Sequence, residues 1–169
     1  MTHARLFAFE ADFVASLRCI PMAVRMKLDR CAIKLTLRQW SRCTLDDRRT
    51  LLEMACRTPH EVGLYRARLV WIVAQRSGEA ARPLAEPAIA LWESAGDVPP
   101  PVITFARSVG VSPPTPQAWF GLSDLERFAL LKLTRDNHDN VNFVPAMQEF
   151  GLLARQGPRR CPAPEAHTS

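Results

Sequence analysis

The spacing of apolar residues predicts a mainly helical protein, and the pattern is clearest between residues 59 and 78. Apolar side chains recur there three or four positions apart, the spacing that places them on one face of an α-helix. Thr58 and Pro59 are typical of a helix start, and Gly78 is typical of a helix end. The residues on this face are Val62, Tyr65, Leu69, Ile72 and Val73.

Capping signatures predict two more helices. A Ser or Thr followed three residues later by an acid can satisfy the free backbone N–H groups of a first helical turn. Thr44–Asp47 predicts a helix to about Cys56, and Ser123–Glu126 predicts one over residues 125–134. The second helix is apolar nearly all round, so we expect it in the centre of the protein.

Shorter elements are predicted on both sides of this central helix. A helix over residues 102–109 should end at Gly110. Asn142 is expected to cap a last helix through Phe150, with Gly151 as the left-handed residue that ends it.

Residues 22–38 and 79–101 are harder to assign. Pro21 suits the start of a helix over residues 22–30, and the alternating residues 33–38 are assigned as extended. The Ala- and Pro-rich residues 79–101 are interpreted as a connector held to the surface by four anchors. These expected anchors are Leu84, Ile89, Leu91 and Trp92.

A shift of 79 positions aligns the two halves of the chain without a gap. Each copy contains a proline-led helix, a Trp, a capping box, an Arg on the next turn and a Leu pair, which indicates one helical unit used twice. The matched residues are Pro21 and Pro100, Trp40 and Trp119, Arg48 and Arg127, Leu51–Leu52 and Leu130–Leu131, and Val62 and Val141. The alternative is that Trp-turn-helix signatures arose twice independently.

These elements predict an all-α fold in which residues 7–153 form one compact domain, with flexible termini at 1–6 and 156–169. A chain of 169 residues with 47% hydrophobic content can bury one substantial core. No stretch approaches the roughly 20 apolar residues that span a membrane, and the early acid Glu10 argues against a signal peptide. We therefore expect a cytoplasmic protein.

Basic charge is concentrated near the N-terminus. The whole chain has 22 basic and 17 acidic residues, but the segment from Arg18 to Arg42 holds seven Lys or Arg and a single acid, Asp29. Nucleic-acid binding would want more charge on a clear recognition helix. A surface for an acidic protein partner explains the pattern better.

The cysteines suggest a second kind of site. Arg precedes Cys19, Cys31 and Cys43, and a neighbouring cation can lower a thiol pKa. Zinc and iron–sulfur sites typically use closely spaced cysteine pairs, which this sequence lacks. Buried, reduced thiols are the better interpretation, with no metal or cofactor expected.

No catalytic motif stands out. His138 lies among Asp and Asn residues in 136–140, where a hydrogen-bonded turn is favoured over acid–base or metal chemistry. The sequence has no Gly-rich phosphate loop and no Gly-x-Ser-x-Gly or His-Glu-x-x-His motif. We therefore do not expect an enzyme.

Three strings, residues 9–29, 127–133 and 142–152, resemble the conserved nitrate reductase-associated protein family. The resemblance covers about residues 7–153. It implies a small cytoplasmic accessory protein that assimilatory nitrate reductase, a molybdenum enzyme, needs for its activity or maturation. It brings no established catalytic residue with it.

Two hypotheses follow. The preferred one is a non-catalytic protein that binds nitrate reductase or its cofactor-delivery machinery. Its expected partner-binding residues are Arg18, Arg25, Lys27, Arg30, Lys34, His138 and Asn142. The alternative is a metal- or molybdenum-cofactor-binding protein that acts through Cys19 and Cys31, and a nucleic-acid regulator is a distant third.

Overall fold

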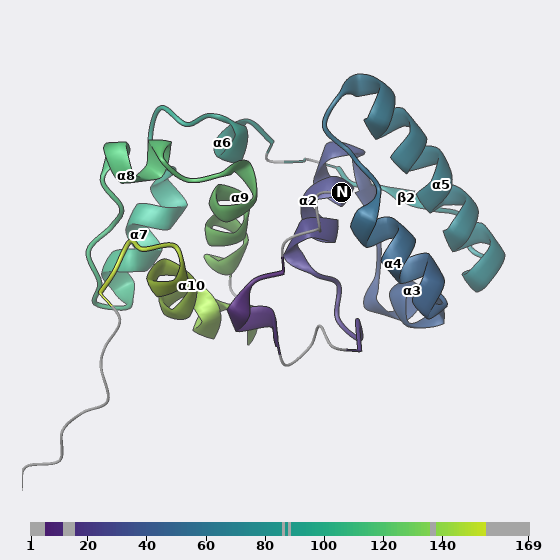
Figure 1. Cartoon of the computed structure of the whole chain (residues 1–169), viewed down its shortest axis with the longest axis horizontal. Helices are drawn as coiled ribbons and strands as arrows, with labels where there is room; N and C mark the ends of the chain where they lie inside the picture. The colour runs from purple at the N-terminus through teal and green to yellow at the C-terminus, as the bar shows by residue number, and fades with distance from the viewer. Residues whose placement is uncertain (1–5, 12–15, 86, 88, 136–137, 155–169) are drawn as a thin grey trace, which may run out of the picture.

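Helices in the chain form two packed groups, which Figure 1 shows side by side. This computed structural model describes residues 6–11, 16–85, 87, 89–135 and 138–154. After the 3-10 helix η1 (Ala8–Glu10), the N-terminal half comprises α2 (Met22–Arg30), β1 (Ile33–Lys34), α3 (Leu37–Arg42), α4 (Leu45–Glu53), α5 (Pro59–Ser77) and β2 (Arg82–Pro83). The C-terminal half comprises α6 (Ile89–Glu93), α7 (Pro100–Ser108), α8 (Pro116–Phe120), α9 (Asp124–Leu133), η2 (His138–Asn142) and α10 (Phe143–Glu149). The mainly helical class predicted from the sequence is confirmed.

The predicted capping residues begin the helices they were assigned to. The Thr44 hydroxyl accepts the Asp47 backbone N–H at 3.1 Å, and the Ser123 hydroxyl accepts that of Glu126 at 3.3 Å. Gly78 ends α5 with a φ of 68°, a left-handed conformation that costs glycine little. Local sequence therefore sets the bounds of these helices.

The segment 33–38 differs from its prediction. Only Ile33–Lys34 is a strand, and it pairs antiparallel with Arg82–Pro83. Thr36 already caps α3, because its hydroxyl accepts the Gln39 N–H while the Gln39 side chain returns to the Thr36 N–H. This reciprocal pair satisfies two first-turn donors and ends the extended segment.

Three smaller expectations are also corrected. The helix after Thr44 ends at Glu53 because Met54 is extended. Leu91 is 42% exposed, so the anchors of α6 are the fully buried Trp92 and the partly buried Ile89. Asn142 precedes α10 without a side-chain capping bond, because the chain enters from a 3-10 turn and Asn142 is itself helical.

Each half has its own hydrophobic core, built around a buried tryptophan. Trp40 is fully buried among the apolar residues of α2, α4 and α5, and Trp119 is fully buried among those of α6, α7, α9 and α10. The indole N–H of Trp40 donates to the Leu17 carbonyl at 2.7 Å, and that of Trp119 points to the Ser94 carbonyl at 3.4 Å. In both halves the tryptophan thus holds the segment before the proline-led helix.

The arginines matched by the 79-residue shift play similar roles. Arg48 donates to the carbonyls of Leu17 and Trp40, at 3.2 and 3.1 Å. Arg127 donates to the carbonyls of Trp92, at 2.8 Å, and of Leu122. The helices α3 and α4 begin 79 residues before α8 and α9. The halves share a local plan, while common ancestry stays a prediction.

Polar contacts between α2 and α9 join the two halves. The ammonium of Lys132 lies 2.9 Å from a carboxylate oxygen of the buried Asp29. Arg30 reaches Asp124 at 3.1 Å and Glu93 at 3.5 Å. These ion pairs tie α2 to the C-terminal half.

Candidate protein-interaction surface

Three of the predicted partner-binding cations, Arg25, Lys27 and Arg30, lie on α2 and bond within the chain. Lys27 Nζ donates to the carbonyls of Leu52 and Met54, at 2.7 and 2.6 Å, where α4 ends. Burial lowers the pKa of Lys27 to about 8. The structure thus uses this lysine to satisfy carbonyls at a helix end, a role the sequence did not reveal.

Arg30 and Arg25 also have partners inside the chain. Arg30 donates to the Cys56 carbonyl at 3.0 Å, and its guanidinium lies 5.0 Å from the ring centroid of Trp92. Arg25 Nε donates to the Ile20 carbonyl at 2.9 Å. The predicted basic stretch is therefore divided between internal contacts and the surface.

The cations left on the surface are Arg18, Lys34 and two arginines of α3. Arg38 and Arg42 are exposed and lie one turn apart on the same side of that short helix. Lys34, Arg38 and Arg42 are called the α3 basic edge below. Asn142 is half-buried, and the side chain of His138 lies outside the described part of the chain.

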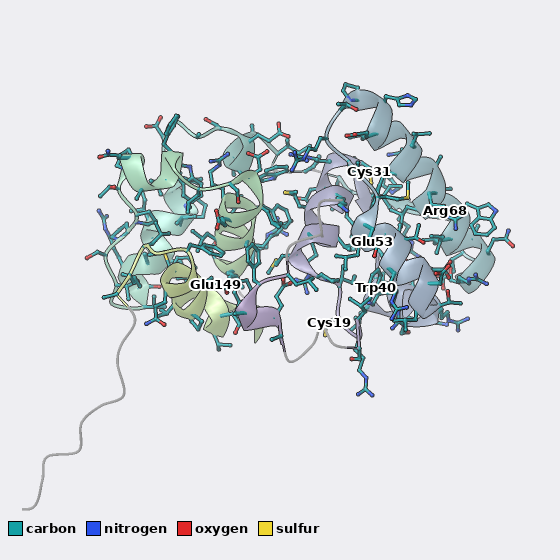
Figure 2. All side chains as sticks on the ribbon, in the orientation of Figure 1. Cys19, Cys31, Trp40, Glu53, Arg68 and Glu149 are labelled. Carbon is teal, nitrogen blue, oxygen red and sulfur yellow. The ribbon has the colours of Figure 1, made fainter. Side chains whose placement is uncertain are left out.

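The two cysteines of the alternative hypothesis do not meet. Figure 2 shows Cys19 and Cys31 in separate parts of the N-terminal half. Cys31 is buried beside the Leu28 carbonyl, and burial raises the pKa of its thiol to about 11. Within the described ranges, no three His, Cys, Asp or Glu side chains are grouped to hold a metal ion. The preceding arginine therefore does not make Cys31 a thiolate.

Sequence reasoning missed a second apolar face on α5. The inner face of this helix buries Tyr65, Leu69, Ile72 and Val73, as predicted. The outer face exposes 54% of Leu64, 39% of Val70 and 47% of Trp71. We call this face, with the exposed Ala67 and Ala74 between them, the α5 outer stripe. Its members follow helical spacing too, which is the signal that could have found it.

An arginine covers the largest side chain of the α5 outer stripe. The Arg68 guanidinium lies 4.8 Å from the ring centroid of Trp71, a cation–π arrangement. In Figure 2 Arg68 lies on α5 at the outer edge of the N-terminal half, away from α9. Trp and Arg are enriched among the interface residues that contribute most to the free energy of binding, and here one of each lies side by side on the surface.

Residues 6–150 match the model of the conserved nitrate reductase-associated protein family. The chain belongs to this family. No curated protein and no solved structure matches it. As a nitrate reductase-associated family member, the chain is linked by the family's description to that enzyme, and the resemblance seen in the sequence is confirmed. Among the helices that the structure describes, none is long and apolar enough to cross a membrane.

Proposed function

We propose that the chain is a non-catalytic, cytoplasmic accessory protein that supports the activity or maturation of assimilatory nitrate reductase, a molybdenum enzyme. The observation that carries the proposal is the family match over residues 6–150, whose description names association with nitrate reductase. The partner is the reductase itself or the machinery that delivers its cofactor. The contact is between proteins.

Exposed cations support an electrostatic contribution to this contact. Arg18 and the α3 basic edge remain on the surface. A group of positive charges attracts an acidic partner and raises the rate of association. Lys27 and Arg30 stabilise the fold that presents these cations. Their loss should weaken the protein before it weakens the contact.

Co-purification from nitrate-grown cells tests the proposal. A tagged chain should enrich nitrate reductase over cells that carry the tag alone. An Arg38→Glu, Arg42→Glu variant should enrich less, mostly through slower association at low salt. Arg107→Glu is the matched control, because Arg107 is an exposed cation of the C-terminal half. Absence of reductase from the wild-type sample would contradict the proposal.

A further inference from the structure

The α5 outer stripe is exposed although its residues are those that proteins normally bury. A helix with one apolar face needs a single neighbour, whereas α5 is apolar on two opposite faces. Its inner face is covered by α2, α3 and α4. At the outer face Leu64, Val70 and Trp71 stay exposed in the described structure, and Figure 1 shows α5 at the edge of the molecule. Contiguous exposed apolar residues of this kind mark interaction sites.

The charged residues that flank the α5 outer stripe are both positive. At 100° per residue, Arg66 and Arg68 fall on its two sides. Arg66 donates to the Cys31 carbonyl and Arg68 lies over Trp71, but within the described chain no carboxylate forms an ion pair with either guanidinium. The acid of α5, Glu61, accepts the backbone N–H groups of Arg57 and Thr58, at 2.8 and 3.0 Å, and is used in the helix cap. A partner that fits this face is therefore apolar between flanking carboxylates.

We propose that the α5 outer stripe is the docking site for nitrate reductase, which meets it with a segment that presents apolar side chains between carboxylates. This inference rests on the proposed function and adds the surface that performs it. Trp71 and Leu64 supply the buried centre of the contact, and Arg66 and Arg68 supply its charged border. Trp and Arg are the residues most often found to dominate interface energies.

A second copy of the chain fits the stripe less well. A contact across a two-fold axis places the same residues of both copies around one centre. With that axis midway between Leu64 and Trp71, both copies of Arg66 and Arg68 would gather near it. Four cations without carboxylates would repel one another. The charges thus favour a different, acidic partner.

Capture of nitrate reductase by the purified full-length chain tests the docking site. The test variant carries both Trp71→Glu and Arg68→Glu and is called the double variant. The matched control is Phe120→Glu, which alters a 71% exposed residue of the other half. We expect the double variant to lose capture at least about tenfold, as for an interface hot spot. Phe120→Glu should stay within about twofold of wild type, and wild-type capture should fall as salt is raised. Circular dichroism of each variant checks that the helices remain formed.

The outcomes separate the two proposals. If wild type and the double variant capture the reductase equally, the docking site is wrong and the proposed function stands. If wild type captures no reductase, the proposed function fails, and the docking site fails with it. Equal loss in the double variant and in Phe120→Glu would also overturn the site, because the effect would not be specific to α5.

Two further measurements exclude other occupants. Sedimentation of the free chain should give the same mass for wild type and the double variant; a dimer that the variant dissociates would make the stripe a contact between copies. The wavelength of maximum tryptophan emission of the chain should not change on addition of phosphatidylglycerol vesicles. A blue shift lost in Trp71→Phe would mean that a membrane surface covers the stripe instead.

Discussion

The helices α3 and α4 of the N-terminal half match α8 and α9 of the C-terminal half, whereas the closing helices α5 and α10 differ. In each half a buried Trp and a buried or half-buried Arg hold the preceding segment, through Trp40 and Arg48 or Trp119 and Arg127. The closing helix then diverges, since α5 has 19 residues and α10 has 7. Most apolar residues of the short α10 are buried in the core, whereas a second apolar face of α5 is exposed to solvent. What the halves share builds the cores, and what differs is available for binding.

The largest expected effects come from the tryptophans that the halves share. Trp40→Ala and Trp119→Ala each leave a large cavity in a core, so each should lower the free energy of unfolding by about 3–5 kcal/mol. Urea denaturation followed by circular dichroism measures both. If one substitution costs less than about 1 kcal/mol, the two halves are not built on the same plan.

The contact between the halves should show the next largest effect. Asp29→Leu leaves the half-buried Lys132 ammonium without its carboxylate, which should cost about 3 kcal/mol. Burial lowers the pKa of Lys132, so part of this cost disappears if the lysine loses its proton. Adding Lys132→Met should restore most of the loss, because two apolar side chains can replace a buried ion pair. A double-mutant cycle that shows simple additivity would contradict a direct coupling of α2 to α9.

Alkaline pH should remove the stability that the buried Cys31 thiol contributes to the N-terminal half, where the described cysteines lie. Burial raises the pKa of Cys31 from its ordinary value of 9.0 to about 11, so the unfolded chain releases this proton first. The stability due to Cys31 is present below pH 9 and is lost as the pH rises to 11, by up to about 2 kcal/mol. The difference in unfolding free energy between wild type and Cys31→Ala, measured from pH 8 to 11, should shrink by that amount. A constant difference would show that the thiol is not held in its neutral form.

The smallest effect on stability is expected where the effect on binding is largest. Trp71→Glu and Phe120→Glu alter exposed side chains, so each should change the free energy of unfolding by about 0.5 kcal/mol or less. Thermal unfolding of both variants checks this. A loss above 2 kcal/mol for Trp71→Glu would mean that the α5 outer stripe serves the fold.

Helix bounds were predictable because local contacts determine them. The hydroxyls of Thr44, Thr58 and Ser123 bond three residues ahead, so the signal lies within a single turn. The same signature, Thr36 followed by Gln39, overlaps an alternating pattern over residues 33–38, so two local signals compete at the start of α3. The pairing of Ile33 with Pro83 joins residues 50 positions apart, and no local pattern reveals it.

The candidate surface was harder to predict because the charge of a residue does not show whether its side chain points to solvent or into the fold. Lys27 and Arg30 turn inward to carbonyls and carboxylates that lie far along the chain, as Arg30 does to Asp124. Their number in the sequence suggested a surface, and their partners became visible only in the fold. Trp71 lies on a helix that is apolar on two opposite faces, so helical spacing alone does not show which face is buried.

Nitrate reductase activity in cells that lack this chain tests the central claim most directly. Activity should be low in extracts of such cells and should return when the wild-type gene is restored. The Phe120→Glu gene should restore it as well, and the Trp71→Glu, Arg68→Glu gene should not. Equal reductase activity with and without the chain would contradict the account of an accessory protein.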